Sequence, residues 1–228
     1  MTATLVLFDI DGTLISSGGA GRRAMDLALQ SQGCAGSSFS MAGMTDRAIA
    51  RRALLAGGCP AHEGAIDAVL VRYLAVLAES LGEQVLVLQG VRELLTRLAG
   101  LAQLRLGLGT GNLAAGAQLK LAGTGLWPYF EFGGFGCDAE ERAKLLRIAA
   151  ERGAVQAGLP LAECRVCVVG DTIHDIVSAR ANGFACLAVA TGGNSRDALA
   201  TEQPQLLVDS LLDPRALQWL AADSGSLT

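Results

Sequence analysis

The sequence predicts an α/β protein, with a parallel β-sheet flanked by helices and a helical domain inserted near its start. Three observations lead to this prediction. Short apolar runs ending in Gly, Asp or Thr recur along the chain, helix-like segments separate them, and one long stretch near the N-terminus shows only helical periodicity. Several runs are apolar at consecutive positions, which is typical of strands buried on both faces of a parallel sheet.

Five apolar runs are expected to form the sheet, and crossover helices would cover its two faces. These runs are residues 5–8, 104–109, 130–135, 166–170 and 186–190. A helix expected over residues 140–152 illustrates the crossovers, because Asp138 can cap it with Glu141 three residues further on. Its inward face would carry Ala143, Leu146 and Ala150.

The stretch from residue 16 to residue 89 contains no convincing strand. Within residues 63–81, apolar side chains recur at helical spacings. Gly18, Gly19 and Gly21 stand at its start and Gly90 follows it, and glycines at both ends suit connections between two bodies. We therefore expect a core of residues 1–15 and 90–228, and a helical cap of residues 16–89.

Composition excludes several classes of protein. The net charge of −4 and the lack of a basic stripe argue against nucleic acid as a partner. No run reaches the ~18 consecutive apolar residues that a membrane span requires. No basic segment precedes the first apolar run, which therefore resembles a first strand more than a signal peptide. These features predict a cytoplasmic protein.

The six cysteines form no spaced framework. Cys164 and Cys167 make a C-x-x-C pair, but the residues from Arg165 on resemble a buried strand, and there is no second pair. We therefore expect free thiols in a reducing cytoplasm, in preference to a zinc or redox motif.

Polar residues directly follow three of the expected strands. The carboxyl ends of parallel strands share one rim of the sheet, which is where ligands bind. The residues in question are Asp9, Asp11, Gly12 and Thr13 after the first strand, Thr110, Gly111 and Asn112 after the second, and Asp171 and Asp175 after the fourth.

Four carboxylates on one rim repel one another, and burying them is costly unless something compensates. Mg²⁺ is a natural solution, because it takes oxygen ligands from one or two carboxylates, water and substrate phosphate. The Thr110 hydroxyl and backbone N–H groups near Gly111 could donate to phosphoryl oxygens. The sequence therefore predicts a magnesium and phosphate site.

Three motifs in this order resemble those of the haloacid dehalogenase superfamily. They are DIDGTL, which begins at Asp9, GTGN, which contains Thr110, and GDTIHD, which contains Asp171 and Asp175. The resemblance covers nearly the whole chain, and it implies a Rossmann-like core with a helical cap inserted between the first two motifs.

The resemblance also implies roles for these residues. Asp9 would be the nucleophile that forms an aspartyl-phosphate, and Asp11 the general acid and base. Mg²⁺ would be held by the Asp9 carboxylate, the Asp11 backbone carbonyl and Asp171, with Asp175 in support. Thr110 would hold a phosphoryl oxygen. The same motifs place Gly12, Thr13, Gly111 and Asn112 around the substrate.

The family also uses a cation, usually Lys, to neutralise the phosphate. The usual Lys-Pro pair is absent here. Arg142 is the preferred candidate because it lies near a helix start, whereas Lys144 would point to a different face of that helix. Lys120, on the preceding expected helix, is the remaining alternative.

These residues favour hydrolysis of a phosphomonoester. Dehalogenases of the superfamily replace the second aspartate, which is present here as Asp11. Phosphonatases use a cap lysine, and residues 16–89 contain none. A sugar phosphomutase on the same core stays an alternative, as does a non-catalytic phosphate-binding protein.

The substrate would be chosen mainly by the cap. A G-x-T-D element with Thr45 and Asp46 resembles phosphoglycolate-phosphatase-like members, although Asp46 could instead cap the following helix. Arg22 could meet a substrate carboxylate. The segment TGGNSRDAL, from Thr191, is also similar to this subgroup and should form a loop after a core strand. A small phosphorylated metabolite, with phosphoglycolate as one candidate, is the expected partner, and nothing in the sequence indicates an oligomeric state.

Overall fold

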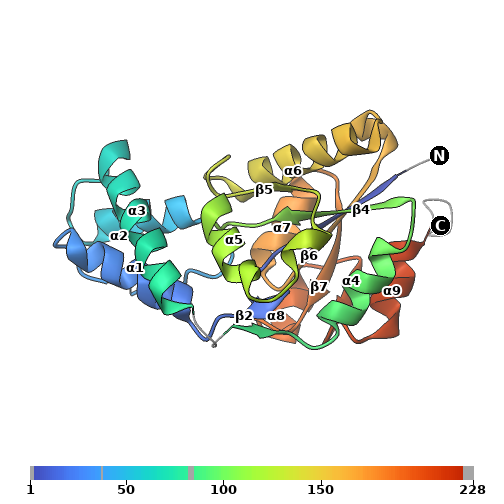
Figure 1. The fold of residues 1–228 in the computed structure, drawn as a ribbon, viewed down its shortest axis with the longest axis horizontal. Coiled ribbons are helices and arrows are strands. Elements are labelled where there is room, and N and C mark those ends of the chain that lie inside the picture. The colour runs from blue at the N-terminus through green and yellow to red at the C-terminus, as the bar shows by residue number, and fades with distance from the viewer. Residues whose placement is uncertain (1–2, 37, 82–84, 223–228) are drawn as a thin grey trace.

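The protein was analysed as a computed structural model that describes residues 3–36, 38–81 and 85–222. A sheet covered by helices forms one body, and three helices form a second body at its side (Figure 1). None of the helices described is long and apolar enough to cross a membrane.

The main sheet has six parallel strands in the order β5-β4-β1-β6-β7-β8. All five predicted runs form strands of it, and the predicted α/β class is confirmed. The sixth strand, β8, was missed because it is short and only partly buried. The strands are β1 (Thr4–Phe8), β4 (Leu104–Gly109), β5 (Phe132–Gly134), β6 (Arg165–Gly170), β7 (Ala185–Val189) and β8 (Leu206–Val208).

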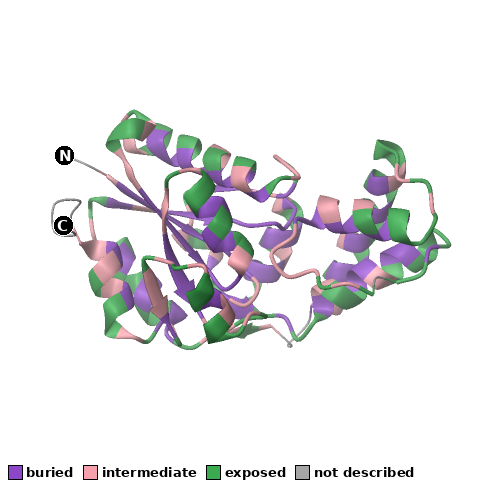
Figure 2. Cartoon of the chain, turned by 180° about the vertical axis from the view of Figure 1, so that it is seen from behind, coloured by how far each residue is buried: buried purple, intermediate pink, exposed green. Residues whose placement is uncertain are grey.

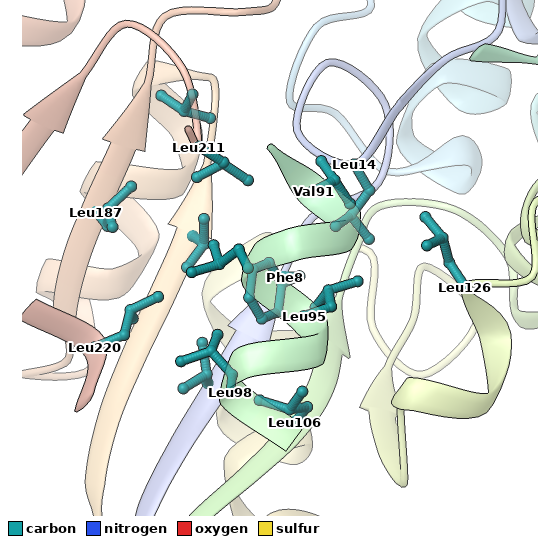
Figure 3. Close-up of a cluster of buried hydrophobic side chains, with 14 of the residues drawn as sticks. Phe8, Leu14, Val91, Leu95, Leu98, Leu106, Leu126, Leu187, Leu211 and Leu220 are labelled. Carbon is teal, nitrogen blue, oxygen red and sulfur yellow. The ribbon is translucent and has the colours of Figure 1, made fainter. Parts of the chain in front are cut away.

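Strand β1 lies in the middle of the sheet and is buried on both faces. Leu5 and Leu7 belong to the apolar cluster on one face, and Val6 and Phe8 to the cluster on the other. Figure 3 shows Phe8 among side chains from several of the surrounding elements. Burying a side chain of this size contributes roughly 1.5–3 kcal/mol, so the central strand anchors both layers.

Helices cover both faces of the sheet, and buried residues follow their inward sides (Figure 2). One face carries α6 (Arg142–Ala157), α7 (Ile173–Ala181) and α8 (Arg196–Thr201), and the other carries α4 (Val91–Ala99), α5 (Ala114–Ala122) and α9 (Pro214–Ala221). Two short 3-10 turns complete this body, at Trp127–Tyr129 and Leu161–Glu163.

The predicted cap of the 140–152 helix is wrong. Helix α6 begins at Arg142, and neither Asp138 nor Glu141 caps it with a side-chain hydrogen bond. Asp138 instead accepts from the backbone N–H of Phe135 at 2.9 Å and pairs with Arg152 at 2.8 Å. The Asp138 carboxylate is therefore engaged by a local turn and by Arg152, further along α6, and it does not cap the helix.

The second body, here called the helical insertion, consists of α1 (Ala20–Ser31), α2 (Asp46–Ala56) and α3 (Glu63–Ser80). The three helices share an apolar cluster, which includes Met25, Leu54 and Tyr73 and extends to Leu113 of the sheet body. The His62 side chain caps α3 by accepting from the N–H of Ala65 at 3.2 Å. The core and cap boundaries at residues 15/16 and 89/90 remain predictions.

Residues 16–89 do contain strand structure, contrary to the prediction. Strand β2 (Ile15–Ser16) pairs antiparallel with β3 (Leu86–Val87), so the two connections of the helical insertion run side by side. Two residues per strand are too few for a periodic pattern to show in the sequence. Gly90 follows with φ +84°, and a Cβ there would lie 2.2 Å from the N atom of Leu212.

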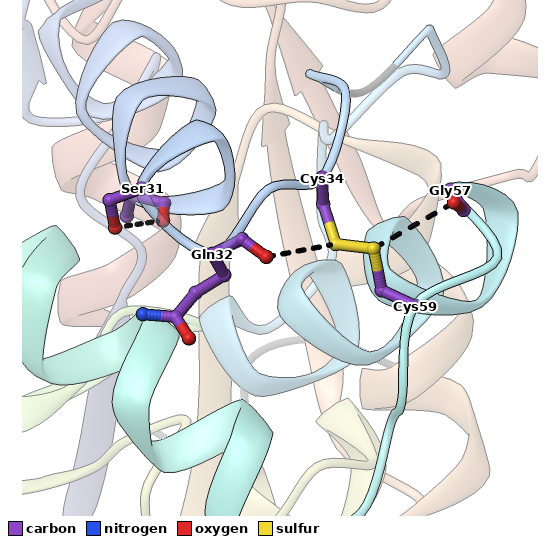
Figure 4. Close-up of a disulfide and its surroundings, with 6 residues drawn as sticks. Ser31, Gln32, Cys34, Gly57 and Cys59 are labelled. Carbon is purple, nitrogen blue, oxygen red and sulfur yellow. Dashed lines mark hydrogen bonds between the residues drawn. A yellow bond between two sulfur atoms is a disulfide. The ribbon is translucent and has the colours of Figure 1, made fainter.

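The expectation of free thiols is wrong for two of the six cysteines. Cys34 and Cys59 form a disulfide that joins the segment after α1 to the segment after α2 (Figure 4). The partners are 25 residues apart in sequence, with a helix between them, so their spacing did not reveal them. Cys164 and Cys167 are free thiols, and Cys167 is buried in β6.

Removing this disulfide should destabilise the protein. A bridge that closes a loop of this length contributes about 2–4 kcal/mol, mainly by restricting the unfolded chain. The Cys34→Ser variant should therefore unfold at lower urea concentration, and the wild type in reductant should match it. Cys137→Ser, at an exposed free thiol, is the control and should unfold like the wild type. Equal unfolding of Cys34→Ser and oxidised wild type would contradict the prediction.

Candidate active site

Three buried carboxylates meet at the carboxyl edge of the sheet. Asp9 follows β1, Asp171 follows β6, and Asp175 lies in the first turn of α7. One oxygen of each lies within 4.8 Å of the others, and all three residues are buried. The structure thus brings together the carboxylates that the motif spacing predicted to converge.

Asp171 is enclosed by loops from two other strands. Its Oδ1 accepts from the Thr13 hydroxyl at 3.0 Å, and its Oδ2 accepts from the Gly193 N–H at 3.2 Å. A Cβ on Gly12, which has φ +83°, would lie 2.5 Å from Oδ2, and one on Gly192 would lie 1.6 Å from it. Only glycine fits at these two positions, because any side chain would displace the carboxylate.

Arg142, the first residue of α6, bridges two of the carboxylates. Its Nη2 lies 3.1 Å from Asp9 Oδ1 and 2.6 Å from Asp175 Oδ1. The other oxygen of Asp175 accepts from the N–H and the hydroxyl of Thr172, at 3.0 and 2.7 Å. Asp175 therefore fixes the guanidinium, and the guanidinium faces Asp9.

Burial and mutual repulsion raise the pKa of the remaining carboxylates. Desolvation is the largest cause for Asp9, and it exceeds the opposing effect of Arg142. Desolvation, with Asp9 and Asp175 nearby, raises the pKa of Asp171 to about 8. Buried carboxylates that repel one another are a suitable set of ligands for a hard divalent cation, because the charge of the cation would offset their repulsion.

Asp11 lies across the site and has a different environment. Its Oδ2 accepts from Lys120 Nζ at 2.6 Å and from Asn112 Nδ2 at 3.0 Å, and its Oδ1 accepts from the Ser17 hydroxyl at 3.4 Å. Burial alone would raise the pKa of Asp11, but Lys120 and these hydrogen bonds outweigh it and lower the pKa. The structure therefore places Lys120 at Asp11, not at the Asp9 carboxylate.

Thr110 connects the two sides of the site. Its hydroxyl lowers the pKa of the neighbouring Asp9 carboxyl, against the larger effect of burial, and accepts from Asn112 Nδ2 at 2.8 Å. Gly111, the next residue, is in close contact with the helical insertion, since a Cβ there would lie 2.3 Å from the carbonyl O of Met44. The GTGN turn thus contacts the carboxylates and the insertion at the same time.

These groups surround a cavity of about 620 Å³ between the sheet edge and the helical insertion. Most of the predicted site residues line it, and Arg22 and Asp46 do so from the insertion. The predicted residues on its wall are Asp9, Asp11, Gly12, Arg22, Asp46, Thr110, Gly111, Asn112, Lys120, Arg142 and Asp171. Thr13, Thr45 and Asp175 lie behind the wall, so they act on neighbouring residues.

Thr45 and Asp46 connect the helical insertion to the sheet edge. Thr45, not Asp46, caps α2, and its hydroxyl also donates to the carbonyl O of Glu140 at 2.9 Å. Asp46 Oδ2 accepts from the N–H of Leu113 at 2.8 Å. The interpretation of Asp46 as a helix cap is therefore wrong, because the preceding threonine occupies that position.

Arg22 lies on the cavity wall with its charge already engaged. Its Nε donates to Asp26 at 3.2 Å, and its Nη1 donates to the carbonyl O of Phe39 at 3.1 Å. A substrate carboxylate would therefore have to compete with Asp26 for this guanidinium.

The sequence did not single out several residues of the cavity wall. The insertion contributes Met25, Met41, Met44, Ile49 and Tyr73, β2 and the residue after it contribute Ser16 and Ser17, and the loop after β7 contributes Thr191, Gly192 and Gly193. Helical periodicity could place Met25 and Tyr73 only in an apolar face. The TGG turn after β7 was predicted as a loop. Its hydroxyl and glycine residues directly after a strand are the signal that could have assigned it to the site.

The fold and this edge of the sheet define a class of hydrolase. The family model for haloacid dehalogenase-like hydrolases matches residues 3–183. The chain therefore belongs to the haloacid dehalogenase-like hydrolases, as its motifs predicted, and it is an enzyme of the phosphatase type.

Individual relatives agree with this assignment. The chain is 30% identical, over 90% of its length and 89% of the relative's, to "Probable phosphatase IndB" of Dickeya dadantii (strain 3937). Its fold resembles a predicted phosphoglycolate phosphatase of Haemophilus somnus 129PT, with a TM-score of 0.72, 19% identity and coverage of 96% and 99% of the two chains. It also resembles a hydrolase of Pseudomonas syringae, with a TM-score of 0.75, 21% identity and coverage of 97% and 100%.

Asp46 should make stability depend on pH. Burial, partly offset by Lys120 and the Leu113 N–H, raises its pKa from 3.8 to about 6. The folded protein therefore binds a proton more tightly than the unfolded chain, so this residue's contribution to stability falls as pH rises from about 4 to about 6. The expected loss is up to ~3 kcal/mol.

The comparison is urea unfolding of wild type and Asp46→Asn between pH 4 and 7, in EDTA. The difference in unfolding free energy between them should change across this range in favour of Asp46→Asn at high pH. Parallel pH profiles would contradict the prediction.

Proposed function

We propose that this protein is a Mg²⁺-dependent phosphomonoester hydrolase that acts on a small phosphorylated metabolite through an aspartyl-phosphate at Asp9. The observation that carries the proposal is the position of Arg142. It lies 3.1 Å from Asp9 and is fixed by Asp175, so a fixed positive charge faces the expected nucleophile. Such preorganised charge stabilises the phosphoryl oxygens of a transition state.

The carboxylates of Asp9 and Asp171 fit the bound cation that the family uses. Their oxygens lie close together, and burial together with the neighbouring carboxylates raises the pKa of both. When bound, Mg²⁺ would neutralise charge on the transferred phosphoryl group. Asp175 would support the site by holding Arg142, since both of its oxygens already accept hydrogen bonds.

The reaction would have two steps. The Asp9 carboxylate attacks phosphorus, a new P–O bond forms, and the ester P–O bond breaks as the leaving oxygen gains a proton. Water then attacks phosphorus and loses a proton, the bond between Asp9 and phosphorus breaks, and inorganic phosphate is released. Asp11 is placed to give a proton to the leaving oxygen and to regain one from the water, and its lowered pKa favours the second of these roles. Thr110 and the N–H groups of its turn would hold the phosphoryl oxygens.

The helical insertion would act as the cap that selects the substrate. A cavity of about 620 Å³ holds the phosphoryl group and leaves room for a metabolite-sized leaving group. Methionine and isoleucine side chains on the insertion side provide apolar contacts, and Arg22 and Asp46 provide polar ones. Phosphoglycolate is one candidate, supported by the resemblance to phosphoglycolate-phosphatase-like proteins.

The test is phosphate release from 4-nitrophenyl phosphate and a panel of small phosphate esters, with Mg²⁺ or EDTA. Wild type should turn over with Mg²⁺ alone, and Asp9→Asn should lose ~10³-fold or more, because it lacks the nucleophile. No release from the panel would contradict the proposal. Isomerisation of a hexose phosphate, accelerated by a bisphosphate, would instead indicate a phosphomutase. One structural neighbour, from Bacteroides vulgatus, is provisionally named a beta-phosphoglucomutase.

Arg142 and Lys144 provide a matched pair of variants. Arg142→Ala should lower kcat/KM by ~10²–10³-fold, because a fixed donor to the phosphoryl group is lost. Lys144→Ala should leave it nearly unchanged, since the Lys144 side chain is 71% exposed and pairs with Glu141. Thermal unfolding of both variants separates loss of activity from loss of structure. Equal activity of the two variants would remove Arg142 from the site.

A further inference from the structure

The chain has two lysines, and they have opposite environments. Lys144 is exposed at the start of α6, whereas the side chain of Lys120, on α5, is only 5% exposed. The Lys120 Nζ lies 2.6 Å from Asp11 Oδ2 and 2.6 Å from Asn112 Oδ1. A buried ammonium group is costly unless it is paired, so this position is held by the two contacts.

Lys120 does not duplicate Arg142. Arg142 contacts Asp9 and Asp175, and Lys120 contacts Asp11 and Asn112. The two buried cations therefore serve different carboxylates on opposite sides of the site. Since Arg142 already faces the expected nucleophile, the phosphate-neutralising role leaves the position of Lys120 unexplained.

The contacts of Asp11 are unequal between its two oxygens. Oδ2 accepts from both Lys120 and Asn112, at 2.6 and 3.0 Å. In the described part of the chain, the side-chain donor to Oδ1 is Ser17, at a long 3.4 Å. The side chain is also 39% exposed. Lys120 and Asn112 thus fix the carboxylate through one oxygen and leave the other available to the cavity.

The helical insertion encloses Lys120 from the other side. A Cβ on Gly21 of α1 would lie 3.3 Å from Nζ, so a larger residue there would press on the ammonium group. The Asp46 carboxylate of α2 and the Tyr73 hydroxyl of α3 also face it. All three helices of the insertion therefore border this one side chain, and water has little access to it.

We propose that Lys120 is a positioning residue for proton transfer, which orients the Asp11 carboxyl group so that its available oxygen can pass a proton to the leaving oxygen of the substrate. The inference rests on the proposed phosphatase function. Lysine suits this task, because its compact ammonium group fits between Asp11, Asn112 and the insertion, whereas arginine presents a wide planar fork. Lys120 itself forms no bond to the substrate in this role.

The test compares two substrates that differ in their need for a proton. The leaving group of 4-nitrophenyl phosphate is a stable phenolate that departs without one, whereas an alkyl phosphate such as glycerol 2-phosphate requires one. Lys120→Met should lower kcat/KM by ~10²-fold on the alkyl ester and by less than ~5-fold on the nitrophenyl ester, because only the former depends on the general acid. Lys144→Met, the same substitution at an exposed site, should leave both values unchanged.

A double-mutant cycle with Asp11→Asn tests whether Lys120 acts through Asp11. If it does, adding Lys120→Met to Asp11→Asn should change kcat/KM on the alkyl ester by less than ~3-fold, because the group it positions is already inactive. Lys120→Gln is made in parallel in case methionine prevents folding, and thermal unfolding is measured for every variant.

Equal losses on the two substrates, or full additivity with Asp11→Asn, would overturn the inference while the phosphatase function stands. Absence of turnover by the wild type would overturn the proposed function and the inference with it. Selective loss on the alkyl ester, with coupling to Asp11, would support both.

Discussion

The crowding of Asp9, Asp171 and Asp175 at one edge of the sheet is the constraint on which the rest of the site depends. Three buried carboxylates within 4.8 Å repel one another and have lost their hydration. Each is held in place by a different part of the chain. Arg142 serves Asp9 and Asp175, Thr172 completes the coordination of Asp175, and loops from two strands enclose Asp171. Because burying three neighbouring carboxylates is costly, residues far apart in sequence must lie at fixed positions to stabilise them.

A division of charge follows from this constraint. The side of the site near Asp9 has three carboxylates and one guanidinium. The carboxylates suit a cation, and the guanidinium suits a phosphoryl group. The side near Asp11 already has its own buried ammonium group, Lys120, and a lowered pKa. Two aspartates separated by one residue thus have different electrostatic environments: a bound cation would be needed to keep Asp9 ionised, whereas Lys120 already does so for Asp11.

The sequence predicted the parts of this protein that rest on local patterns. Strands buried on both faces appear as continuous apolar runs, and their carboxyl ends could be located from them, so Asp9, Asp11, Thr110 and Asp171 were predicted at the sheet edge where the cavity lies. The β2–β3 pairing, the disulfide and the contact of Lys120 with Asp11 depend on segments distant in sequence, and no local pattern encodes them.

The β2–β3 pairing has a mechanical consequence. The two connections of the helical insertion, β2 and β3, are hydrogen-bonded to each other. The insertion is therefore attached to the core by one two-stranded ribbon, like a door on a single hinge. The opposite side is closed by non-covalent contacts of residues 43–51, in which Arg142 holds the Gly43 carbonyl, Asp46 N–H reaches the Gly111 carbonyl at 2.8 Å, and Arg51 pairs with Glu140. Most of these contacts use backbone atoms at the site itself. Swinging this door would therefore break a few hydrogen bonds, each worth about 0.5–1.5 kcal/mol, and would separate Leu113 and Leu119 of the sheet body from the apolar cluster of the insertion.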